Sequence, residues 1–245
     1  MSARITTATA LRVLRQLRHD PRTVVLLITV PCLLITLLRF IYDRQPQTFD
    51  RIGGPMVGLF PLLSMFLVTS ITMLRERTTG TLERLMTMPL AKLDLLAGYG
   101  LAFALVAAVQ ATIVATLAFA ALGLDVAGPV PVVIALAIAN ALLGMSLGLF
   151  TSAFARSEFQ ALQFMPAFLL PQLLLCGLFV PRSQMAAVLE AISWALPLTY
   201  AFDALDHVTS AGALGGRGAL DVGVTVAAMG LSLLLAAMTL RRRTS

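Results

Sequence analysis

One short motif in the sequence has the spacing of a catalytic site. Gly144-Met145-Ser146-Leu147-Gly148 matches the G-x-S-x-G pattern of serine hydrolases, whose serine attacks a carbonyl carbon. Such a serine needs a neighbouring base, and both histidines, His19 and His207, fall outside the apolar segment that contains Ser146. Small residues at this spacing also let membrane helices pack closely. We therefore interpret the motif as a packing element and expect that the chain is not an enzyme; a membrane-embedded enzyme is the least favoured alternative.

Nucleotide and metal chemistry have no suitable residues in the sequence. Lys92 is the only lysine and is followed by Leu93, so the Gly-Lys-Ser/Thr of a Walker A loop is absent. Cys32 and Cys176 lie within apolar runs, where a thiol packs as a small hydrophobic group. The histidines are far apart in sequence, and no carboxylates cluster at the spacing of metal ligands. We expect this chain to hold no cofactor and no metal.

The composition places the chain in a lipid bilayer. Of its 245 residues, 58% are hydrophobic and 12% are charged, and the mean hydropathy is +0.90; an average soluble domain has about 25% charged residues. The net charge of +6 does not indicate binding to nucleic acid, because the basic residues flank apolar runs instead of forming a soluble basic face. The length fits one membrane domain.

Six apolar stretches predict six transmembrane helices in this all-helical domain. They cover residues 23 to 42, 52 to 74, 95 to 122, 130 to 153, 161 to 181 and 220 to 240. An even number of spans places both termini on one side, and most of the 18 Lys and Arg residues fall on that side, which the positive-inside rule identifies as the cytoplasm. The excess of Arg over Lys hints at a bacterial genome. We expect a multi-pass protein of the bacterial cytoplasmic membrane with both termini cytoplasmic.

Two further segments are predicted to lie at the membrane surface. In residues 3 to 19, apolar and arginine side chains fall on different arcs of a helical wheel, which predicts an amphipathic interfacial helix with its arginines among the headgroups. Residues 182 to 219 hold two apolar pieces that are too short to span a bilayer. Trp194 and Tyr200, in this second segment, have the aromatic preference for the interface.

The longest charged stretch between spans runs from Arg75 to Pro89 and reads RERTTGTLERLMTMP. Gly80 suits an N-cap, and Leu82, Leu85 and Met86 recur at helical spacing. Residues 80 to 88 are therefore predicted to form a short cytoplasmic helix with one apolar face. Such a helix suits either the membrane surface or the groove of a partner protein.

This stretch resembles the cytoplasmic loop of type-2 ABC (ABC-2) exporter permeases, a group that includes the daunorubicin-resistance-type drug exporters. A second stretch supports the resemblance: residues 171 to 181 read PQLLLCGLFVP, and residues 197 to 205 read PLTYAFDAL. The resemblance covers nearly the whole chain, including the number of spans and their orientation.

The resemblance implies an ABC transporter permease that pairs with itself or with a sister permease, docks separate ABC ATPase subunits that bind ATP and Mg²⁺, and exports a small amphiphilic substrate across the lipid bilayer. It implies that residues 80 to 88 are the coupling helix and that residues 182 to 219 form re-entrant helices capping the substrate path. The implied ATPase-coupling residues are Arg75, Glu76, Gly80, Thr81, Leu82, Glu83, Arg84, Leu85 and Met86. The implied residues of a re-entrant gate are Trp194, Pro197, Leu198 and Tyr200.

An ion-coupled secondary transporter is the chief alternative. It requires an ionisable residue deep in the membrane, and the predicted spans hold almost none. The polar residues within or beside the spans are Gln110, Asn140, Gln160, Gln163 and Gln172. These side chains either line a substrate path or cross-link helices through hydrogen bonds.

Overall fold

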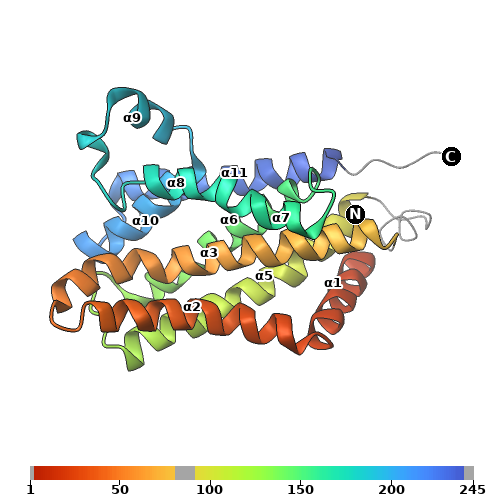
Figure 1. Cartoon of the computed structure of the whole chain (residues 1–245), viewed down its shortest axis with the longest axis horizontal. Helices are drawn as coiled ribbons and strands as arrows, with labels where there is room; N and C mark the ends of the chain where they lie inside the picture. The colour runs from red at the N-terminus through yellow and green to blue at the C-terminus, as the bar shows by residue number, and fades with distance from the viewer. Residues whose placement is uncertain (1–2, 81–91, 240–245) are drawn as a thin grey trace.

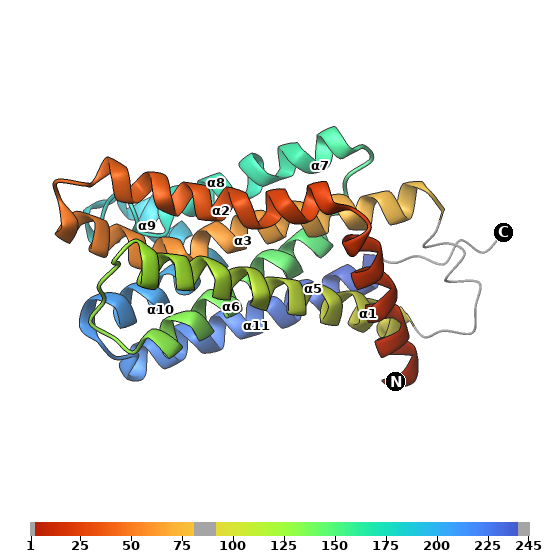
Figure 2. The same cartoon turned by 90° about the horizontal axis from the view of Figure 1, so that it is seen from below.

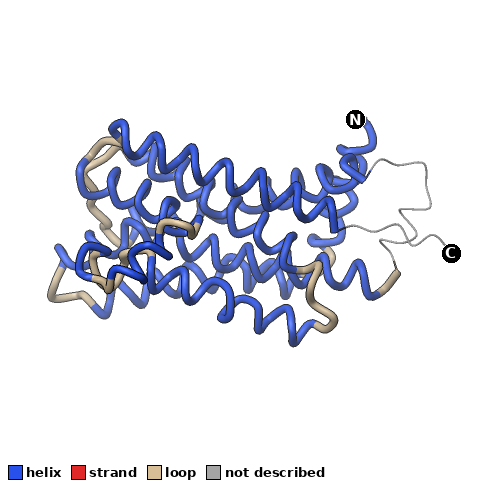
Figure 3. The backbone as a smooth tube through the Cα atoms, turned by 90° about the horizontal axis from the view of Figure 1, so that it is seen from above, coloured by secondary structure: helices blue, strands red, loops and turns tan. Residues whose placement is uncertain are grey.

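The computed structural model describes residues 3–80 and 92–239, and every regular element in these ranges is a helix (Figure 1). In chain order the elements are α1 (Ala3–Arg18), α2 (Pro21–Ile41), α3 (Pro46–Thr78), α5 (Lys92–Thr116), η1 (Leu117–Ala121), α6 (Val130–Thr151), α7 (Glu158–Phe164), η2 (Met165–Leu169), α8 (Leu170–Leu175), η3 (Arg182–Gln184), α9 (Ala187–Ser193), α10 (Pro197–Ala211) and α11 (Gly215–Thr239). Short loops join the helices in the trace of Figure 3. The prediction of an all-helical fold is confirmed for these residues.

The long helices run side by side, and α1 crosses one end of the bundle (Figure 2). Among the described helices, five segments are long and apolar enough to cross a membrane: Pro21–Ile41, Pro46–Thr78, Ala97–Ala121, Val130–Thr151 and Gly215–Thr239. The bent pair α9 and α10 makes a sixth candidate if it counts as one span. Because α1 and α9 lie at opposite ends of the bundle, we call these the α1 end and the α9 end.

The segment predicted as a span at residues 161 to 181 differs from that expectation. Its helix begins at Glu158, ends at Leu175 and is divided into α7, the π-helical segment η2 and α8. Pro166 and Pro171 lack the backbone N–H that a regular helix needs, which accounts for the division. No single piece is long enough to span; α7 and η2 pack along α3, and α8 contacts α10 and α9.

Glycines let α6 pack directly on α3 in the centre of the bundle. A Cβ atom at Gly144 would overlap the backbone of Leu62, and one at Gly148 would overlap the side chain of Thr69. Phe66 and Leu143 are fully buried beside this contact. The approach of the two backbones therefore depends on the missing side chains, as small residues allow in membrane helices.

Two buried amide side chains cross-link the helices. The N–H missing at Pro31 leaves the carbonyl of Leu27 without its helical donor. Nε2 of Gln110 in α5 donates to this carbonyl at 2.7 Å and to Oγ of Ser64 in α3 at 2.5 Å. Nδ2 of Asn140 in α6 donates at 3.1 Å to the carbonyl of Ala201 in α10. Gln110 and Asn140 thus cross-link helices, which is one of the two roles expected for them; the other was to line a substrate path.

Residues 187–211 form a bent hairpin at the α9 end, and the predicted region 182 to 219 extends past it into α11, which begins at Gly215. The seven residues of α9 and the fifteen of α10 meet at an angle of 85°. Pro197 starts α10, because its fixed φ suits the first turn and its missing N–H is not needed there. In Figure 1, α9 stands away from the parallel helices at the upper left.

Candidate functional sites at the two ends of the bundle

The implied coupling helix lies mostly outside the described residues. Thr81, Leu82, Glu83, Arg84, Leu85 and Met86 all fall in this undescribed stretch. Gly80, the last residue before it, has a φ of 72° and directly follows the C-cap Thr79 of α3. This is the geometry of a helix C-terminus, so Gly80 ends α3, and the helix that it was predicted to cap lies outside the described residues. A left-handed glycine at this position turns the chain away from α3.

Arg75 ties the end of α3 to the start of α7. Its Nε donates to Oε1 of Glu158 at 2.7 Å, and its Nη2 donates to Oε2 at 3.2 Å. The two side chains are 53% and 52% exposed. Planar guanidinium and carboxylate groups favour this bidentate arrangement, but water screens an exposed pair, which limits its contribution to stability.

Glu76 is buried and joins three helices at the α1 end. Its Oε1 accepts a hydrogen bond from Nη1 of Arg12 in α1 at 3.3 Å, and Nη2 of Arg12 donates to the hydroxyl of Tyr99 in α5. The Glu76 side chain is only 2% exposed. The guanidinium of Arg12 also lies 5.5 Å from the centre of the Tyr99 ring. These contacts hold α1 against both helices that flank the undescribed stretch.

Sequence reasoning missed the partners in this triad. It placed Arg12 with Arg4, Arg15 and Arg18 among the lipid headgroups, whereas the structure turns Arg12 inward to Glu76 and leaves the other three exposed. The buried face of α1 carries Thr9, Ala10 and Val13, and Arg12 lies at its edge. Nothing in the local pattern of α1 distinguishes one arginine, because the partners are far away in sequence.

The residues of the implied gate surround the bend between α9 and α10. The hydroxyl of Tyr200 donates to the carbonyl of Trp194 at 2.7 Å, and the two rings lie 6.3 Å apart. Leu198 is fully buried, one residue after Pro197. The structure thus places all four residues at the bend and joins Trp194 to Tyr200 across it, while their role as a gate stays a prediction.

A charged cluster beside this bend was not predicted. Nη1 and Nη2 of Arg182 donate to the two carboxylate oxygens of Asp203 at 2.8 and 2.6 Å. Nη1 also donates to the carbonyl of Cys176 at 3.1 Å. The guanidinium groups of Arg182 and Arg217 lie 4.6 and 5.5 Å from the centre of the Trp194 ring. The bend is therefore fixed by an ion pair and by cations stacked on one aromatic ring.

Besides Asp203, the α9 end holds another acid, Asp221, which was not noticed when the predicted spans were searched for ionisable residues. Asp221 lies in α11, within the predicted span 220 to 240, and is 1% exposed. Nε2 of His207 lies 3.8 Å from its Oδ2. Glu76 and Asp221, two of the four buried acids among the described residues, thus lie near the two ends of the bundle rather than at its middle, and each lies close to a basic residue. The sequence signal was present, because Asp221 interrupts an apolar run.

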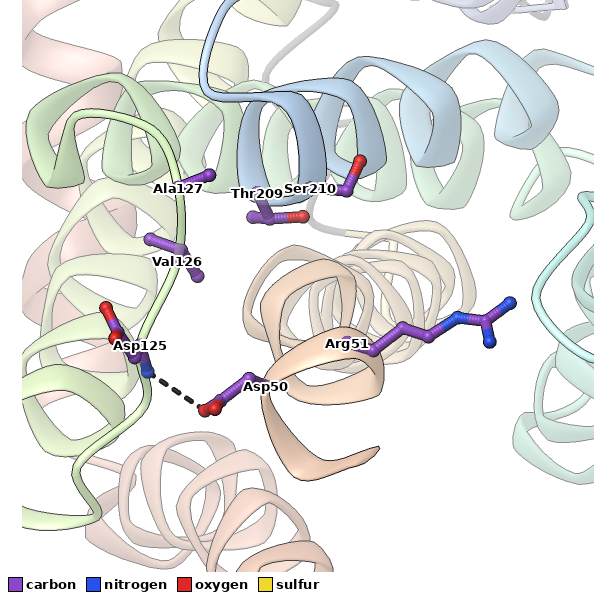
Figure 4. Close-up of a pocket in the computed structure, with 7 residues that line it drawn as sticks. All are labelled: Asp50, Arg51, Asp125, Val126, Ala127, Thr209 and Ser210. Carbon is purple, nitrogen blue, oxygen red and sulfur yellow. Dashed lines mark hydrogen bonds between the residues drawn. The ribbon is translucent and has the colours of Figure 1, made fainter. Parts of the chain in front are cut away.

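Figure 4 shows a cavity at the α9 end. It measures about 410 Å³ and is lined by Asp50, Arg51, Asp125, Val126, Ala127, Thr209 and Ser210. The backbone N–H of Asp125 donates to Oδ1 of Asp50 at 3.0 Å, the dashed line in the figure. Thr209 donates to the carbonyl of Leu205 in its own helix. The Asp50 carboxylate thus attaches the loop between η1 and α6 to α3, and the backbone N–H of Ala127, which donates to the carbonyl of Thr209 at 3.0 Å, attaches the same loop to α10.

Ser146 is placed for packing and not for nucleophilic attack. Its Oγ is fully buried and donates to the carbonyl of Leu143 in its own helix at 2.8 Å. His19 lies against the carbonyl of Arg15, and His207 lies beside Asp221. Within the described ranges, no group of three or more His, Cys, Asp or Glu residues could hold a metal ion.

The apolar helices and the paired charges at their ends define a multi-pass helical membrane protein. Residues 5–208 match the ABC-2 type transporter family, and the chain belongs to this family. The resemblance to ABC-2 permeases is confirmed.

Two relatives show the extent of similarity. The "Probable multidrug ABC transporter permease YbhR" of Escherichia coli K12 is 27% identical over 148 residues, which cover 60% of this chain and 40% of the relative. The "ABC transporter G family member 20" of Dictyostelium discoideum is 26% identical over 169 residues, which cover 69% of this chain and 23% of the relative. The matches span less than half the length of either relative.

Proposed function

We propose that this chain is the permease subunit of an ATP-driven ABC exporter. A separate ABC ATPase binds ATP and Mg²⁺, and the permease, paired with a second copy or a sister subunit, moves drugs, lipids or other amphiphiles outward. The protein lies in the bacterial cytoplasmic membrane with the α1 end in the cytoplasm. Family membership and the five apolar helices support this assignment, and the similarity to a probable multidrug ABC transporter permease of Escherichia coli supports drugs as a substrate class.

The arrangement at the end of α3 is the observation that carries the mechanism. Arg75 connects α3 to α7, and the adjacent Glu76 connects α3 to α1 and lies near Tyr99 of α5. The stretch between α3 and α5 therefore starts from a point that is bonded to the surrounding helices. A force applied to that stretch reaches several spans at once, as a coupling element requires.

The hypothesised mechanism is alternating access. Closure of the ATPase subunits displaces residues 80 to 88, and the bonded helix ends pass this movement to the spans. The equilibrium then shifts toward an outward-open state, because the ATP-bound partner binds that state more tightly. The hairpin of α9 and α10 caps the path at the outer face, with Trp194, Pro197, Leu198 and Tyr200 around its bend.

Co-purification with the ATPase tests this proposal. The complex is extracted in detergent, and the amount of ATPase bound per permease is compared between wild type and Leu82→Asp plus Leu85→Asp. Charged side chains on the apolar face of a docking helix remove its hydrophobic contact with the partner's groove. We expect binding in wild type and its loss in the double variant.

The matched control introduces the same two charges at the opposite end. Leu189→Asp plus Ile192→Asp replaces two exposed apolar residues of α9 and should leave ATPase binding unchanged. Equal loss in both double variants would argue against docking through residues 80 to 88. A wild-type permease that transports without any ATPase would contradict the ATP-driven mechanism and favour an ion-coupled transporter.

A further inference from the structure

A polar cavity of about 590 Å³ lies beside Trp194 at the α9 end. It is enclosed by the start of α3, the connection from α8 to α9, α9 itself, α10 and the start of α11. Its charged or titratable lining residues are Arg51, Arg182, Arg217, Glu190, Asp203, Asp206 and His207. A concave site with converging polar groups and some apolar wall, here Leu178 and Phe202, is the usual form of a small-ligand site.

Two of these charges already neutralise each other. Arg182 and Asp203 form the bidentate pair described above, and their side chains are 15% and 11% exposed. Their hydrogen bonds hold both groups in place, so they make a rigid wall of the cavity. The remaining charges decide which ligand the cavity can hold.

Arg51 and Asp206 are opposite charges that do not pair. Both line the cavity. Within the part of the chain that the structure describes, the ion pairs include neither residue. A ligand that carries a positive and a negative group a few bonds apart would satisfy both. A ligand of a single charge would satisfy one and be repelled by the other.

The ends of two candidate spans place the cavity near the headgroup level of a bilayer that these helices would cross. The cavity is located where α3 and α11, two of the candidate spans, begin. On α9, the apolar side chains of Val188, Leu189 and Ile192 are exposed, whereas Glu190 lines the cavity. A short helix with one exposed apolar face suits the boundary between headgroups and acyl chains.

We propose that this cavity binds a zwitterionic headgroup in which an ammonium and a phosphate are joined by a short linker. The phosphate lies at Arg51, with Arg217 near it at the opening, and the ammonium lies at Asp206. A bilayer phospholipid and an amphiphile in transit can present this same chemistry. The inference requires binding alone and does not rest on the proposed function.

Trp194 provides a direct readout, because it is the only tryptophan in the chain and it lines the cavity. A phosphate that draws Arg217 away from the indole ring changes the emission of that ring. The detergent-solubilised full chain is titrated with O-phosphoethanolamine, with dihexanoyl phosphatidylethanolamine, with dihexanoyl phosphatidylglycerol and with inorganic phosphate. We expect saturable changes with the two zwitterions, and not with the two probes that lack an ammonium.

Three variants locate the response. Arg51→Gln and Asp206→Asn should each weaken zwitterion binding about tenfold, since each removes one charge-assisted contact. Arg15→Gln, an exposed arginine on α1 at the opposite end, should have no effect. Circular-dichroism melting of each variant shows that it is folded.

The outcomes separate the sources and decide the proposal. A response to free O-phosphoethanolamine identifies headgroup recognition, and a response confined to the acylated probe but weakened by both variants identifies a lipid. Both results support the site. Equal responses to inorganic phosphate or phosphatidylglycerol would show a simple anion site, and a response insensitive to Arg51→Gln and Asp206→Asn would show binding elsewhere. Either of these results, or no response at all, overturns the proposal.

Discussion

Nε2 of Gln110 in α5 replaces the backbone donor that Pro31 removes from α2. It lies 2.7 Å from the carbonyl of Leu27, four residues before the proline. The Gln110 side chain is fully buried. Because water does not reach hydrocarbon, a carbonyl without a donor is costly there, and helices that contain proline depend on such substitutes.

The first prediction concerns this pair. Gln110→Leu should lower the free energy of unfolding by about 1–3 kcal/mol, the cost of leaving a buried acceptor unbonded. Pro31→Ala restores the helical donor to Leu27, so Gln110→Leu should cost less in that background. Equilibrium unfolding in detergent of the four proteins of this double-mutant cycle measures the difference. Equal costs in both backgrounds would mean that the hydrogen bond to Leu27 carries no energetic weight.

Glycine substitutions test the contact between α3 and α6. Gly144→Ala places a Cβ against the backbone of Leu62, which cannot move aside as a side chain can. We expect a loss of about 1–3 kcal/mol in the free energy of unfolding, as for other overpacked sites. Gly230→Ala in α11 is the matched control, because nothing lies within 4 Å of its added methyl group. Similar melting temperatures for both variants would contradict the close packing.

Arg12 and Arg75 form ion pairs of very different burial. Arg12→Gln leaves the carboxylate of Glu76, which is 2% exposed, without its cation. We expect a cost of about 2–3 kcal/mol, below the value for a fully buried pair because Arg12 itself is partly exposed. Arg75→Gln has the same size change but breaks an exposed pair, so it should cost less than about 1 kcal/mol. Chemical unfolding of both variants measures these losses in the free energy of unfolding. A larger loss for Arg75→Gln than for Arg12→Gln would contradict the prediction.

Asp20 gives a prediction that depends on pH. Hydrogen bonds from the side chain and backbone of Thr23 hold the pKa of Asp20 below its usual value of 3.8. The pKa of Asp20 is lower in the folded than in the unfolded protein. The stabilisation is therefore present at neutral pH and is lost as the pH falls through the folded-state pKa. Asp20→Ala should therefore cost about 1 kcal/mol at pH 7, the usual worth of an N-cap.

Unfolding at two pH values checks the cap. The difference in the free energy of unfolding between wild type and Asp20→Ala should decrease when the pH is lowered from 7 to about 3, which is below the usual carboxyl pKa. Asp43→Ala is the control, since Asp43 makes only an exposed pair with Arg39. If the difference in the free energy of unfolding between wild type and Asp20→Ala does not change with pH, the charge of Asp20 does not stabilise α2.

Local patterns in the sequence contain much of the fold. The apolar run at residues 130 to 153 predicts a span, and α6 occupies Val130–Thr151. The proline at 197 marks the start of α10, and Asp20 precedes α2 as its cap. Hydropathy and helix-end preferences act within a few residues, so they are readable without tertiary information.

The partners of the candidate functional residues could not be predicted, because they are set by contacts between segments far apart in sequence. Arg12 and Glu76 are 64 positions apart, and Arg182 and Asp203 are 21 apart. Each of these charges looks in sequence like a solvated end of a helix. How the helices pack decides which of these charged side chains is buried beside a distant partner. The packing is known only from the three-dimensional structure.

The bend between α9 and α10 has a mechanical consequence. The hydroxyl of Tyr200 reaches back to the carbonyl of Trp194, and the hydroxyl of Thr199 reaches back to the carbonyl of Ser193, each at 2.7 Å. These two braces join the limbs on either side of the 85° angle into one rigid body. Because Asn140 of α6 also donates to the carbonyl of Ala201 in α10, the braced corner is anchored to the bundle, so a displacement of α10 would carry α9 with it.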